Sequence, residues 1–502
     1  MLLLVFSSIS AGIFFRFYQL GLQELWYDEL FSTVSAQEPL LSDFMYEWAF
    51  CDGNPPGYGL FLWLWLKVFP PTEFYVRLPS AIAGSLSLVL FYFLGKRYVS
   101  HRAAIIATIL FSFCYGGIFY AQEARSYSFL MLFATVTTFL WLRLVQEFQH
   151  TKVFLQHFPL YVLSLIVLSY THYFGLLLGG MLTAYLFFLS IYYQKNIGIV
   201  FACIVLWVLC YLPWINRLLF LFSIDKTQWG YEGLNAFSDY FVILLFKNHP
   251  VSKAITIALL IAALSIAIFK IKTFIQSKNY DKLLLWDRNA LYYISLVSFM
   301  VMLILPFSIR GIDYRHYMVF FPLHFLLLGQ LYAGVFRKNL WAPFLVFTCS
   351  AIAFYFQMSN YYEVHKQQWG TSVKHVLRHY SPHADVVILG IPQERPTLEY
   401  IRRGEIYESF YVRNYDFYQY YFDRFNDKNF PIELKVLRPD IEAFTNYLES
   451  VKNSEKDDVF ILGGHHLTLD EDVLHLLQKA ASEYYEKSYF STKVYWFKFD
   501  QL

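Results

Sequence analysis

The chain has 502 residues, of which 57% are hydrophobic, 21% aromatic and only 16% charged. Soluble domains carry about 25% charged residues, so this composition argues against a soluble protein. Because the apolar residues gather in long runs, it favours a polytopic membrane protein. The net charge of +2 gives no reason to expect nucleic-acid binding. The five cysteines are far apart and show neither a disulfide framework nor metal-ligand spacing, so we expect them to pack as small apolar residues.

Apolar runs along the chain predict the membrane spans, because a spanning helix needs roughly 17–25 mostly apolar residues. The first run lacks a basic leader and a cleavage site, so we interpret it as a retained helix. Two of the runs are short but extend into polar flanks, Phe129–Leu142 and Phe158–Tyr170. Together the runs predict about eleven spans. The remaining runs are Leu2–Leu20, Leu78–Leu94, Ala103–Tyr120, Phe174–Ile191, Ile197–Trp214, Ala254–Phe269, Leu291–Phe307, Tyr317–Ala333 and Leu340–Phe356.

One further apolar run, Gly57–Phe69, is too short to cross the membrane comfortably, and we interpret it as interfacial. With this run excluded, the basic loops alternate regularly with the others and are expected to be cytoplasmic. The N-terminus is then inside and the C-terminus outside. The basic loops are Gly95–Arg102, Arg143–Lys152, the loop at Lys195, Lys270–Arg288 and Arg337–Asn339.

The chain changes character near residue 358. Residues 1–357 are predicted to form a membrane module with a long first outer loop, residues 21–77. Residues 358–502 are polar and are predicted to form an extracytoplasmic α/β domain, because short β-like runs alternate with helix-like stretches. The β-like runs are Ala384–Gly390, Asp457–Gly464 and Thr492–Phe499.

Ionisable residues gather in the predicted outer loops. Such residues are expensive at membrane depth and are functional candidates by default. Arginine and histidine side chains suit an anionic phosphate ligand, and a carboxylate suits a general base. This combination fits the transfer of a group from a lipid-linked phosphate to an acceptor. The candidates are Asp28, Glu29, Asp52, Arg77, Glu123, Arg125, Tyr127, His172, Arg315 and Tyr317.

Each candidate also has an ordinary structural interpretation. Asp28 and Glu29 are equally compatible with capping an interfacial helix. A lone arginine at the end of a span more often snorkels to the interface. His172 fits an interfacial histidine, whereas His324, inside a span, is interpreted as a core residue. Only the recurrence of these residue types on one predicted face favours a site.

Six motifs in chain order carry a family resemblance: "LWYDE", "DGNPPGY", "VRLPSAIAGSLS", "AQEARSYSFL", "THYFGLLLG" and "YRHYMVFFP". With these, the chain resembles the polyprenyl-phosphate-sugar-dependent membrane glycosyltransferases of the GT-C fold, glycosyltransferase family 39-like. Within that group it is similar to protein O-mannosyltransferases and aminoarabinose transferases. Two positions depart from the family pattern. Asn54 stands where a histidine often precedes Pro-Pro, and His316 separates Arg315 from Tyr317.

The resemblance implies an inverting transfer from a polyprenyl-phosphate sugar to a lipid, glycan or protein acceptor on the outer face of the cytoplasmic membrane. Asp28 is then the general base, with Glu29 orienting the acceptor or sharing that role. If the acceptor is itself a phosphate, no base is needed. The implied donor-phosphate ligands are the arginines 77, 125 and 315, with Tyr127, His172 and Tyr317 as hydrogen-bond partners. Asp52 and Glu123 complete the predicted substrate-binding set.

Some questions stay open at this point. Some relatives require a divalent metal, but no compact ligand cluster in the sequence demands one. The absence of eukaryotic-type repeats after residue 358 favours a bacterial enzyme. A multispan transporter or lipid flippase is the main alternative, although such proteins place ionisable residues near the midplane and contain internal repeats. A membrane scaffold without activity leaves the loop motifs unexplained.

Overall fold

The computed structural model divides the chain into two compact units. The helical unit comprises Met1–Leu20, Gly53–Phe61 and Arg77–Tyr362, and the sheet unit comprises Gly21–Asp52, Leu62–Val76 and Glu363–Leu502. Most of the predicted first outer loop therefore groups with the C-terminal part of the chain, while the functional division after residue 357 stays a prediction. The structure describes residues 2–223, 236–237, 239–241, 250–277, 286–308, 312–335, 341–358, 366–392, 399, 411–454, 456–465 and 467–499.

The helical unit holds the membrane spans, so the protein is an integral membrane protein. Within the described ranges, eight helices are long and apolar enough to cross a membrane, or nine if one bent pair forms a single span. They are α5 (Glu73–Tyr98), α8 (Tyr127–Gln146), α9 (Thr151–Thr171), α10 (Tyr173–Tyr192), α11 (Ile197–Ser223), α13 (Pro250–Ser277), α14 (Trp286–Ser308) and the stretch Tyr314–Gly334, in which the 3-10 helix η5 (Tyr314–Phe320) leads into α15 (Phe321–Val335).

Two shorter apolar helices, α1 (Leu2–Phe17) and α16 (Trp341–Met358), coincide with further predicted spans. The bent pair joins α6 (His101–Phe113) to the stretch Tyr115–Gln122, where α7 (Tyr115–Phe119) and η2 (Tyr120–Gln122) turn away by 62°. The total of about eleven spans stays a prediction. The predicted basic loop 337–339, and residues 278–285 of the loop before α14, lie outside the described residues.

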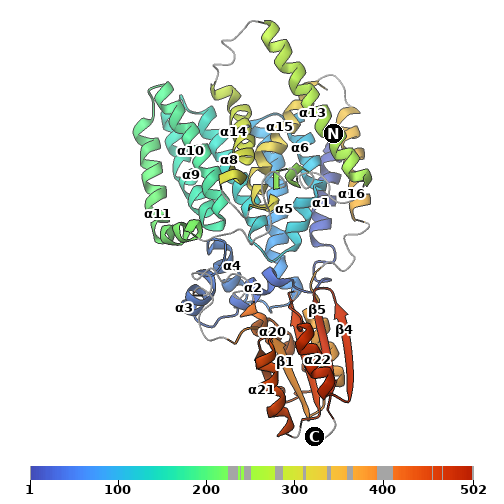
Figure 1. Ribbon diagram of the computed structural model, residues 1–502. Coiled ribbons are helices and arrows are strands. Elements are labelled where there is room, and N and C mark those ends of the chain that lie inside the picture. The colour runs from blue at the N-terminus through green and yellow to red at the C-terminus, as the bar shows by residue number, and fades with distance from the viewer. Residues whose placement is uncertain are drawn as a thin grey trace. The chain divides into compact units, whose positions relative to one another are not determined.

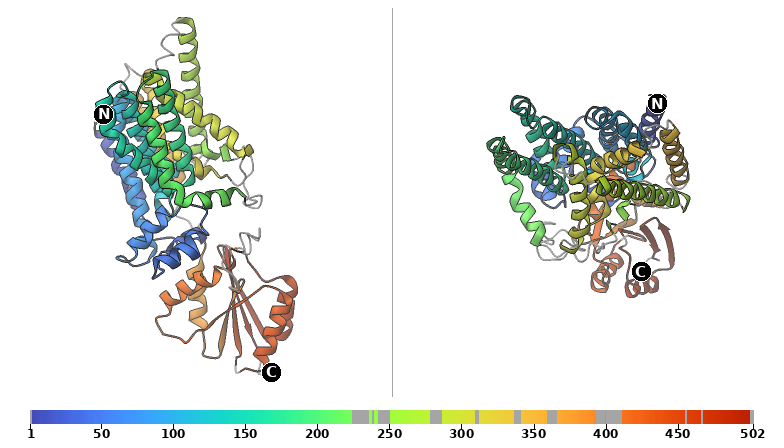
Figure 2. Two further views of the ribbon diagram at one scale, coloured as in Figure 1. Left: turned by 90° about the vertical axis from the view of Figure 1, so that its left-hand side faces the viewer. Right: turned by 90° about the horizontal axis from the view of Figure 1, so that it is seen from above.

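Packing in the helical unit follows two groups of helices (Figure 1). Helices α9, α10 and α11 contact one another, and α6 packs against α1, α15 and α16. Buried side chains of both groups, together with those of α8, form the core of the unit, and Figure 2 shows the helices of the unit end-on. The backbones of α15 and α6 approach closely at Gly329, where an added Cβ would lie 2.3 Å from the Ala103 carbonyl oxygen. A small residue is needed at such a crossing.

Helix α4 (Gly57–Trp65) occupies the first part of the apolar run that was predicted to be interfacial. Its nine residues correspond to a length of about 14 Å, less than half of a hydrocarbon core. An added Cβ at Gly57 would lie 2.5 Å from the Tyr170 carbonyl oxygen, so the helix starts against the end of α9. Its placement at the interface stays a prediction.

The sheet unit contains the predicted α/β domain. Five strands form a sheet in the order β2-β1-β3-β5-β4. Strand β1 is parallel to β2 and β3, whereas β5 is antiparallel to β3 and β4. The predicted β-like runs correspond to β1 (Ala384–Leu389), β3 (Asp458–Gly464) and β5 (Thr492–Lys498), while β2 (Leu434–Leu437) and β4 (Glu483–Tyr489) were not predicted.

Helices cover both faces of this sheet (Figure 2). On one face, α21 (Ile441–Lys452) and α22 (Glu471–Ala480) bury a core with alternate strand residues such as Val387 and Ile461. On the other face lie α17 (Trp369–His379) and α20 (Asn414–Phe425). Alternation of side chains along each strand supplies both cores.

The N-terminal part of the sheet unit consists of α2 (Tyr27–Ser35), the short helix α3 (Leu41–Asp43) and the π-helix η1 (Phe44–Ala49). The Arg413 guanidinium stacks on the Trp48 ring at 3.7 Å from its centroid and donates to the Glu47 carbonyl oxygen at 2.7 Å. Helix α2, which carries Asp28 and Glu29, is thus part of a segment that packs on the C-terminal residues of the same unit.

Candidate active site

His172 is the centre of a polar cluster in the helical unit. It lies between α9 and α10, and its Nδ1 accepts a hydrogen bond from the Phe174 N–H at 3.1 Å. Since Nδ1 is an acceptor, the ring proton lies on Nε2. The His172 side chain is 2% exposed, and its Nε2 has no hydrogen-bond partner among the described residues. The cluster therefore contains a buried N–H donor that no other described residue satisfies.

Two arginines bring positive charge to this histidine. Burial first, and then the charges of Arg125 and Arg315, lower the pKa of His172 to about 3. His172 is therefore neutral at physiological pH. The Arg315 guanidinium lies 5.9 Å from the Tyr127 ring centroid, and that ring lies 5.9 Å from the ring of His172. The structure thus brings together four of the predicted phosphate-site residues.

Arg315 pairs with the residue that caps its 3-10 helix, since its Nε lies 2.9 Å from Oδ2 of Asp313, the N-cap of η5. Next to it, His316 places its ring 5.6 Å from His172 and stacks on Phe174 at 5.0 Å. The sequence analysis noted His316 only as a departure from the family pattern. Its neighbour Tyr317 is fully buried and donates its hydroxyl proton to the Met302 carbonyl oxygen at 3.1 Å. That proton is therefore used within the fold.

Arg77 lies in the second turn of α5 and is 1% exposed. Its Nη1 donates to the Leu20 carbonyl oxygen at 3.0 Å. One turn later, the Ser80 hydroxyl donates to the Arg125 carbonyl oxygen at 3.3 Å, so α5 is fixed to the loop that carries Arg125. Glu123, in the same loop, is 2% exposed.

A second buried histidine, His324, has a hydrogen-bond partner at both ring nitrogens. His324 in α15 has the Tyr240 hydroxyl 2.6 Å from Nδ1 and the Ser298 hydroxyl 2.8 Å from Nε2. Its ring also stacks on Phe299 at 4.0 Å. The structure agrees with the interpretation of His324 as a core residue.

The predicted catalytic carboxylates lie in the first turn of α2, in the sheet unit. Glu29 is fully buried, and its Oε2 lies 2.8 Å from Nζ of Lys366, which is 7% exposed. The same oxygen accepts the Trp26 backbone N–H at 3.4 Å, as in one half of a capping box. Asp28 is half-buried. The two adjacent acids therefore have different environments.

The residues around Lys366 also hold the chain before α2. Gln367 Oε1 accepts the Tyr27 N–H at 2.8 Å. Glu24 accepts the Gly370 N–H at 2.8 Å and the Thr371 hydroxyl at 2.6 Å. Burial raises the pKa of Glu24, opposed by these hydrogen bonds and by the charge of Lys374. Neither Lys366 nor Gln367 was predicted, because no sequence pattern marks them.

Asp52 follows η1 in the chain, and its N–H donates to the Trp48 carbonyl oxygen at 3.0 Å. It is half-buried. Its predicted role in substrate binding stays a prediction.

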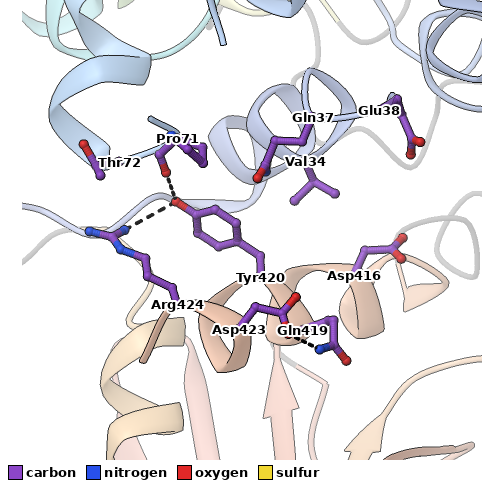
Figure 3. A pocket seen from close by; sticks show the side chains of 10 residues that line it. All are labelled: Val34, Gln37, Glu38, Pro71, Thr72, Asp416, Gln419, Tyr420, Asp423 and Arg424. Carbon is purple, nitrogen blue, oxygen red and sulfur yellow. Dashed lines mark hydrogen bonds between the residues drawn. The ribbon is translucent and has the colours of Figure 1, made fainter. Parts of the chain in front are cut away.

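The other end of α2 borders a cavity of about 490 Å³ within the sheet unit (Figure 3). Tyr420 crosses one side of it, donating to the Pro71 carbonyl oxygen. Neither Asp28 nor Glu29 lines this cavity, which therefore lies at the end of α2 away from the predicted catalytic turn. Its lining residues are Val34, Gln37, Glu38, Pro71, Thr72, Asp416, Gln419, Tyr420, Asp423 and Arg424.

Within the described part of the chain, no group of three or more histidine, cysteine, aspartate or glutamate side chains is placed to hold a metal ion. The five cysteines form no disulfide.

Comparison with known proteins bears on the fold and on one region of the chain. Residues 53–215 match the family model of dolichyl-phosphate-mannose-protein mannosyltransferases, and this range contains Arg77, Arg125 and His172. The chain matches ArnT from Cupriavidus metallidurans over 98% of its own length and 97% of that chain, at 10% identity and a TM-score of 0.57. The chain shares its fold. No curated protein matches the chain in sequence.

Two further structures are similar. ArnT from the same organism bound to undecaprenyl phosphate gives a TM-score of 0.55 at 10% identity, with 98% of this chain and 97% of that chain covered. The oligosaccharyltransferase AglB from Archaeoglobus fulgidus, in complex with an inhibitory peptide and a dolichol-phosphate, gives 0.51 at 12% identity, with 98% and 74% covered. The GT-C fold indicated by the motifs is confirmed.

Proposed function

We propose that this membrane protein is a glycosyltransferase that takes a sugar from a polyprenyl-phosphate donor. The observation that carries the proposal is the buried Nε2–H of His172, which has no hydrogen-bond partner among the described residues and lies beside the charges of Arg125 and Arg315. A buried donor without a partner costs about 1–3 kcal/mol. A phosphate oxygen would satisfy it and would match the two guanidinium charges.

The similar structures support a lipid-linked phosphate as the ligand class. One ArnT structure contains undecaprenyl phosphate and the AglB complex contains a dolichol-phosphate. The family model that matches residues 53–215 is also named for a dolichyl-phosphate sugar donor. We therefore infer that the donor phosphate binds at Arg125, His172 and Arg315, with Arg77 and Tyr127 completing the site.

In the proposed reaction, the acceptor oxygen attacks the anomeric carbon while the bond from that carbon to the phosphate oxygen breaks. The arginines stabilise the negative charge that develops on the leaving phosphate. Asp28 takes the proton of the acceptor hydroxyl as general base, which is worth about 10²–10⁴ in rate. Direct displacement inverts the anomeric centre. With a phosphate acceptor, the proton step is absent and Asp28 only positions the acceptor.

The proposal extends to the sugar, the acceptor, the membrane and the division of the chain. The transferred sugar is a hexose or pentose, and the acceptor is a lipid, glycan or protein. The chain lies in the cytoplasmic membrane with the C-terminal domain on the extracytoplasmic side. Functionally, residues 1–357 form the transferase module with its first outer loop, and residues 358–502 form the outer domain.

The direct test uses purified protein in lipid nanodiscs and a panel of polyprenyl-phosphate sugars, with nucleotide sugars as control donors. We expect sugar release or transfer from at least one lipid-linked donor and from none of the nucleotide sugars. The same donors are also tested for movement across the bilayer of proteoliposomes. Lipid movement without any sugar release would replace the transferase with a lipid flippase.

The topology is tested separately by cysteine labelling in cells. A cysteine placed at Trp65, at the end of α4, and another at exposed Tyr485, in β4, are both expected to react with an impermeant reagent added outside the cytoplasmic membrane. A control cysteine at exposed Gln149, in the predicted cytoplasmic loop Arg143–Lys152, is expected to stay protected. Labelling of position 485 only from the cytoplasm would overturn the orientation.

A further inference from the structure

The contacts between residues 366–371 and residues 24–29, all within the sheet unit, separate the roles of Asp28 and Glu29. We propose that Lys366 and Gln367 are positioning residues for the first turn of α2, that Glu29 is the buried counter-ion in this arrangement, and that Asp28 alone is the general base. This inference rests on the proposed function and deepens it, because it assigns the C-terminal domain a part in turnover.

The ion pair between Lys366 and Glu29 carries most of the argument. The Glu29 side chain is fully buried and the Lys366 side chain is 7% exposed, with 2.8 Å between Nζ and Oε2. Removing one member of a buried pair leaves an uncompensated charge, which is strongly unfavourable. The paired oxygen also accepts the Trp26 N–H at 3.4 Å. A carboxylate held by an ammonium group and the backbone is a poor base and is closed to an acceptor.

Gln367 fixes the same turn through the backbone. The Tyr27 N–H belongs to the first turn of α2, where backbone donors have no partner within the helix. Gln367 Oε1 accepts this N–H at 2.8 Å and the Trp369 indole N–H at 3.0 Å, and its Nε2 lies 3.0 Å from His465 Nδ1. The amide is thus itself held on both sides, and its position determines where α2 begins.

The chain just before α2 is fixed in the same way. Glu24 accepts hydrogen bonds from Gly370 and Thr371 at the start of α17, and the Leu25 N–H donates to the Tyr421 hydroxyl at 3.1 Å. Residues 24–29 therefore follow a path that the C-terminal residues determine. Asp28 lies inside this fixed stretch yet is half-buried, so it keeps access to a ligand that the buried Glu29 lacks.

The test compares Lys366→Met with a matched control, Lys435→Met. Lys435 pairs with Asp385 elsewhere in the sheet unit, between β2 and β1. With the donor found active for the wild type, we expect Lys366→Met to lower kcat at least tenfold and to leave the donor KM within twofold. Lys435→Met is expected to stay within twofold of the wild type in both kcat and the donor KM. Lys366→Arg keeps the positive charge and is expected to keep most of the wild-type kcat.

Hydrogen exchange gives a reading that does not depend on activity. Lys366→Met is expected to speed exchange of the α2 amides at least tenfold, with α21 and the strands unchanged as the folding control. The double variant Glu29→Gln/Lys366→Met removes both charges, and such replacements are often close to neutral. It is therefore expected to restore slow exchange in α2 and to regain at least fivefold in kcat over Lys366→Met.

Two results would overturn the inference. The first is that Lys366→Met keeps the hydrogen-exchange rates of α2 and the kcat of the wild type, or loses no more kcat than Lys435→Met does. The other is a double variant with restored exchange whose kcat stays as low as that of Asp28→Asn, because Glu29 would then take part in the chemistry. If the wild type releases sugar from no donor, the proposed function fails. The exchange experiment then still measures whether Lys366 stabilises the first turn of α2.

Discussion

The cluster at His172 and the first turn of α2 both bury ionisable groups, but they satisfy them differently. Around Glu29 the fold supplies the partner, a lysine at 2.8 Å. At His172 the fold supplies one partner, the Phe174 N–H, and leaves the Nε2–H with none among the described residues. An unsatisfied buried donor is unfavourable, so it is the better indicator of a ligand. A buried charge whose partner is supplied by the fold, such as Glu29, indicates instead a residue that positions the chain.

The same distinction holds between two histidines of the helical unit. Both His172 and His324 are almost fully buried. His324 has a hydroxyl group near each ring nitrogen, whereas the described residues supply His172 with a partner at Nδ1 only. Residue type and burial therefore do not separate a ligand-binding histidine from a core histidine. The number of hydrogen-bond partners does.

The largest effect is expected at Asp28, where the comparison assigns chemistry to the accessible acid. Asp28→Asn keeps the shape of the side chain but removes its basicity, so kcat should fall by about 10²–10⁴. Donor affinity, which the proposal assigns to the other unit, should stay within twofold. Steady-state turnover and equilibrium binding of the lipid-linked donor measure the two quantities separately.

Two outcomes at Asp28 would contradict this assignment. Near-normal turnover of Asp28→Asn with a hydroxyl acceptor would remove it as the base. A matched loss of donor affinity and turnover would make it a binding residue instead. Asp43→Asn provides a control at a half-buried aspartate of the same segment that lies outside the predicted site, and we expect its effect on kcat to be much smaller.

The next largest effects concern the two arginines beside His172. Losing one charge-assisted contact to phosphate costs about 1.5–3 kcal/mol. Arg125→Ala and Arg315→Ala should therefore each weaken donor binding at least tenfold. Arg143→Ala is the control, because Arg143 lies in the last turn of α8 and pairs with Glu147. Donor affinity unchanged in both test variants, measured by equilibrium binding, would remove the arginines from the site.

The sequence indicated the fold and several residues of the polar cluster at His172 because both follow from local patterns, while the binding of a phosphate there stays a prediction. Apolar runs mark the spans, and the short motifs place Arg125 and His172 at the ends of those spans. Runs of β-branched residues marked β1 and β3, which are buried on both faces. Strand β4 was missed because most of its residues are exposed and polar, so no apolar pattern reveals it.

The contacts of Lys366 and Gln367 with the first turn of α2 were not predictable from the sequence, for a different reason. Lys366 and Glu29 are 337 residues apart, and a lone lysine in a polar stretch has no pattern that names its partner. The same limit applies to the grouping of residues 21–52 with the C-terminal part of the chain. Local periodicity identifies helices and strands. Only the tertiary contacts show that Glu29, and not Asp28, forms a buried ion pair.

A smaller effect is expected from His172→Asn. Asparagine is a good N-cap residue, so it should keep the cap that His172 provides for α10, but its shorter side chain cannot place a donor at the Nε2 position. This hydrogen bond joins an uncharged donor to a charged phosphate, so it contributes near the lower end of about 1.5–3 kcal/mol. Donor affinity should therefore fall by about tenfold, with little change in thermal stability.

His324→Asn is the matched control, and it should show the opposite signature. It breaks the contacts with Tyr240 and Ser298 in the core, so the melting temperature should fall while donor affinity stays unchanged. Thermal unfolding and donor binding are measured on both variants. Identical signatures for the two histidines would remove the distinction between an unsatisfied and a satisfied side chain.

The smallest expected effect is that of pH on donor binding. Burial and the charges of Arg125 and Arg315 lower the pKa of His172 to about 3. A lowered pKa favours the neutral ring at every pH above it, so His172 gains a proton only in strong acid. A phosphodiester donor keeps its negative charge over the same range. Between pH 5.5 and 8, donor affinity should therefore change by less than twofold.

A histidine with the ordinary pKa of about 6.5 behaves differently. It would be mostly protonated at pH 5.5, and its hydrogen bond to phosphate would then join two opposite charges, which strengthens it beyond the bond from a neutral ring. Affinity would then rise several-fold towards low pH, and His172→Asn would abolish the rise. The bound phosphate itself favours protonation, but it would have to raise the pKa of His172 from about 3 to above about 5.5, against two guanidinium charges. A pH-independent affinity in the wild type, together with a lower but equally pH-independent affinity in His172→Asn, would identify His172 as a neutral donor to the phosphate.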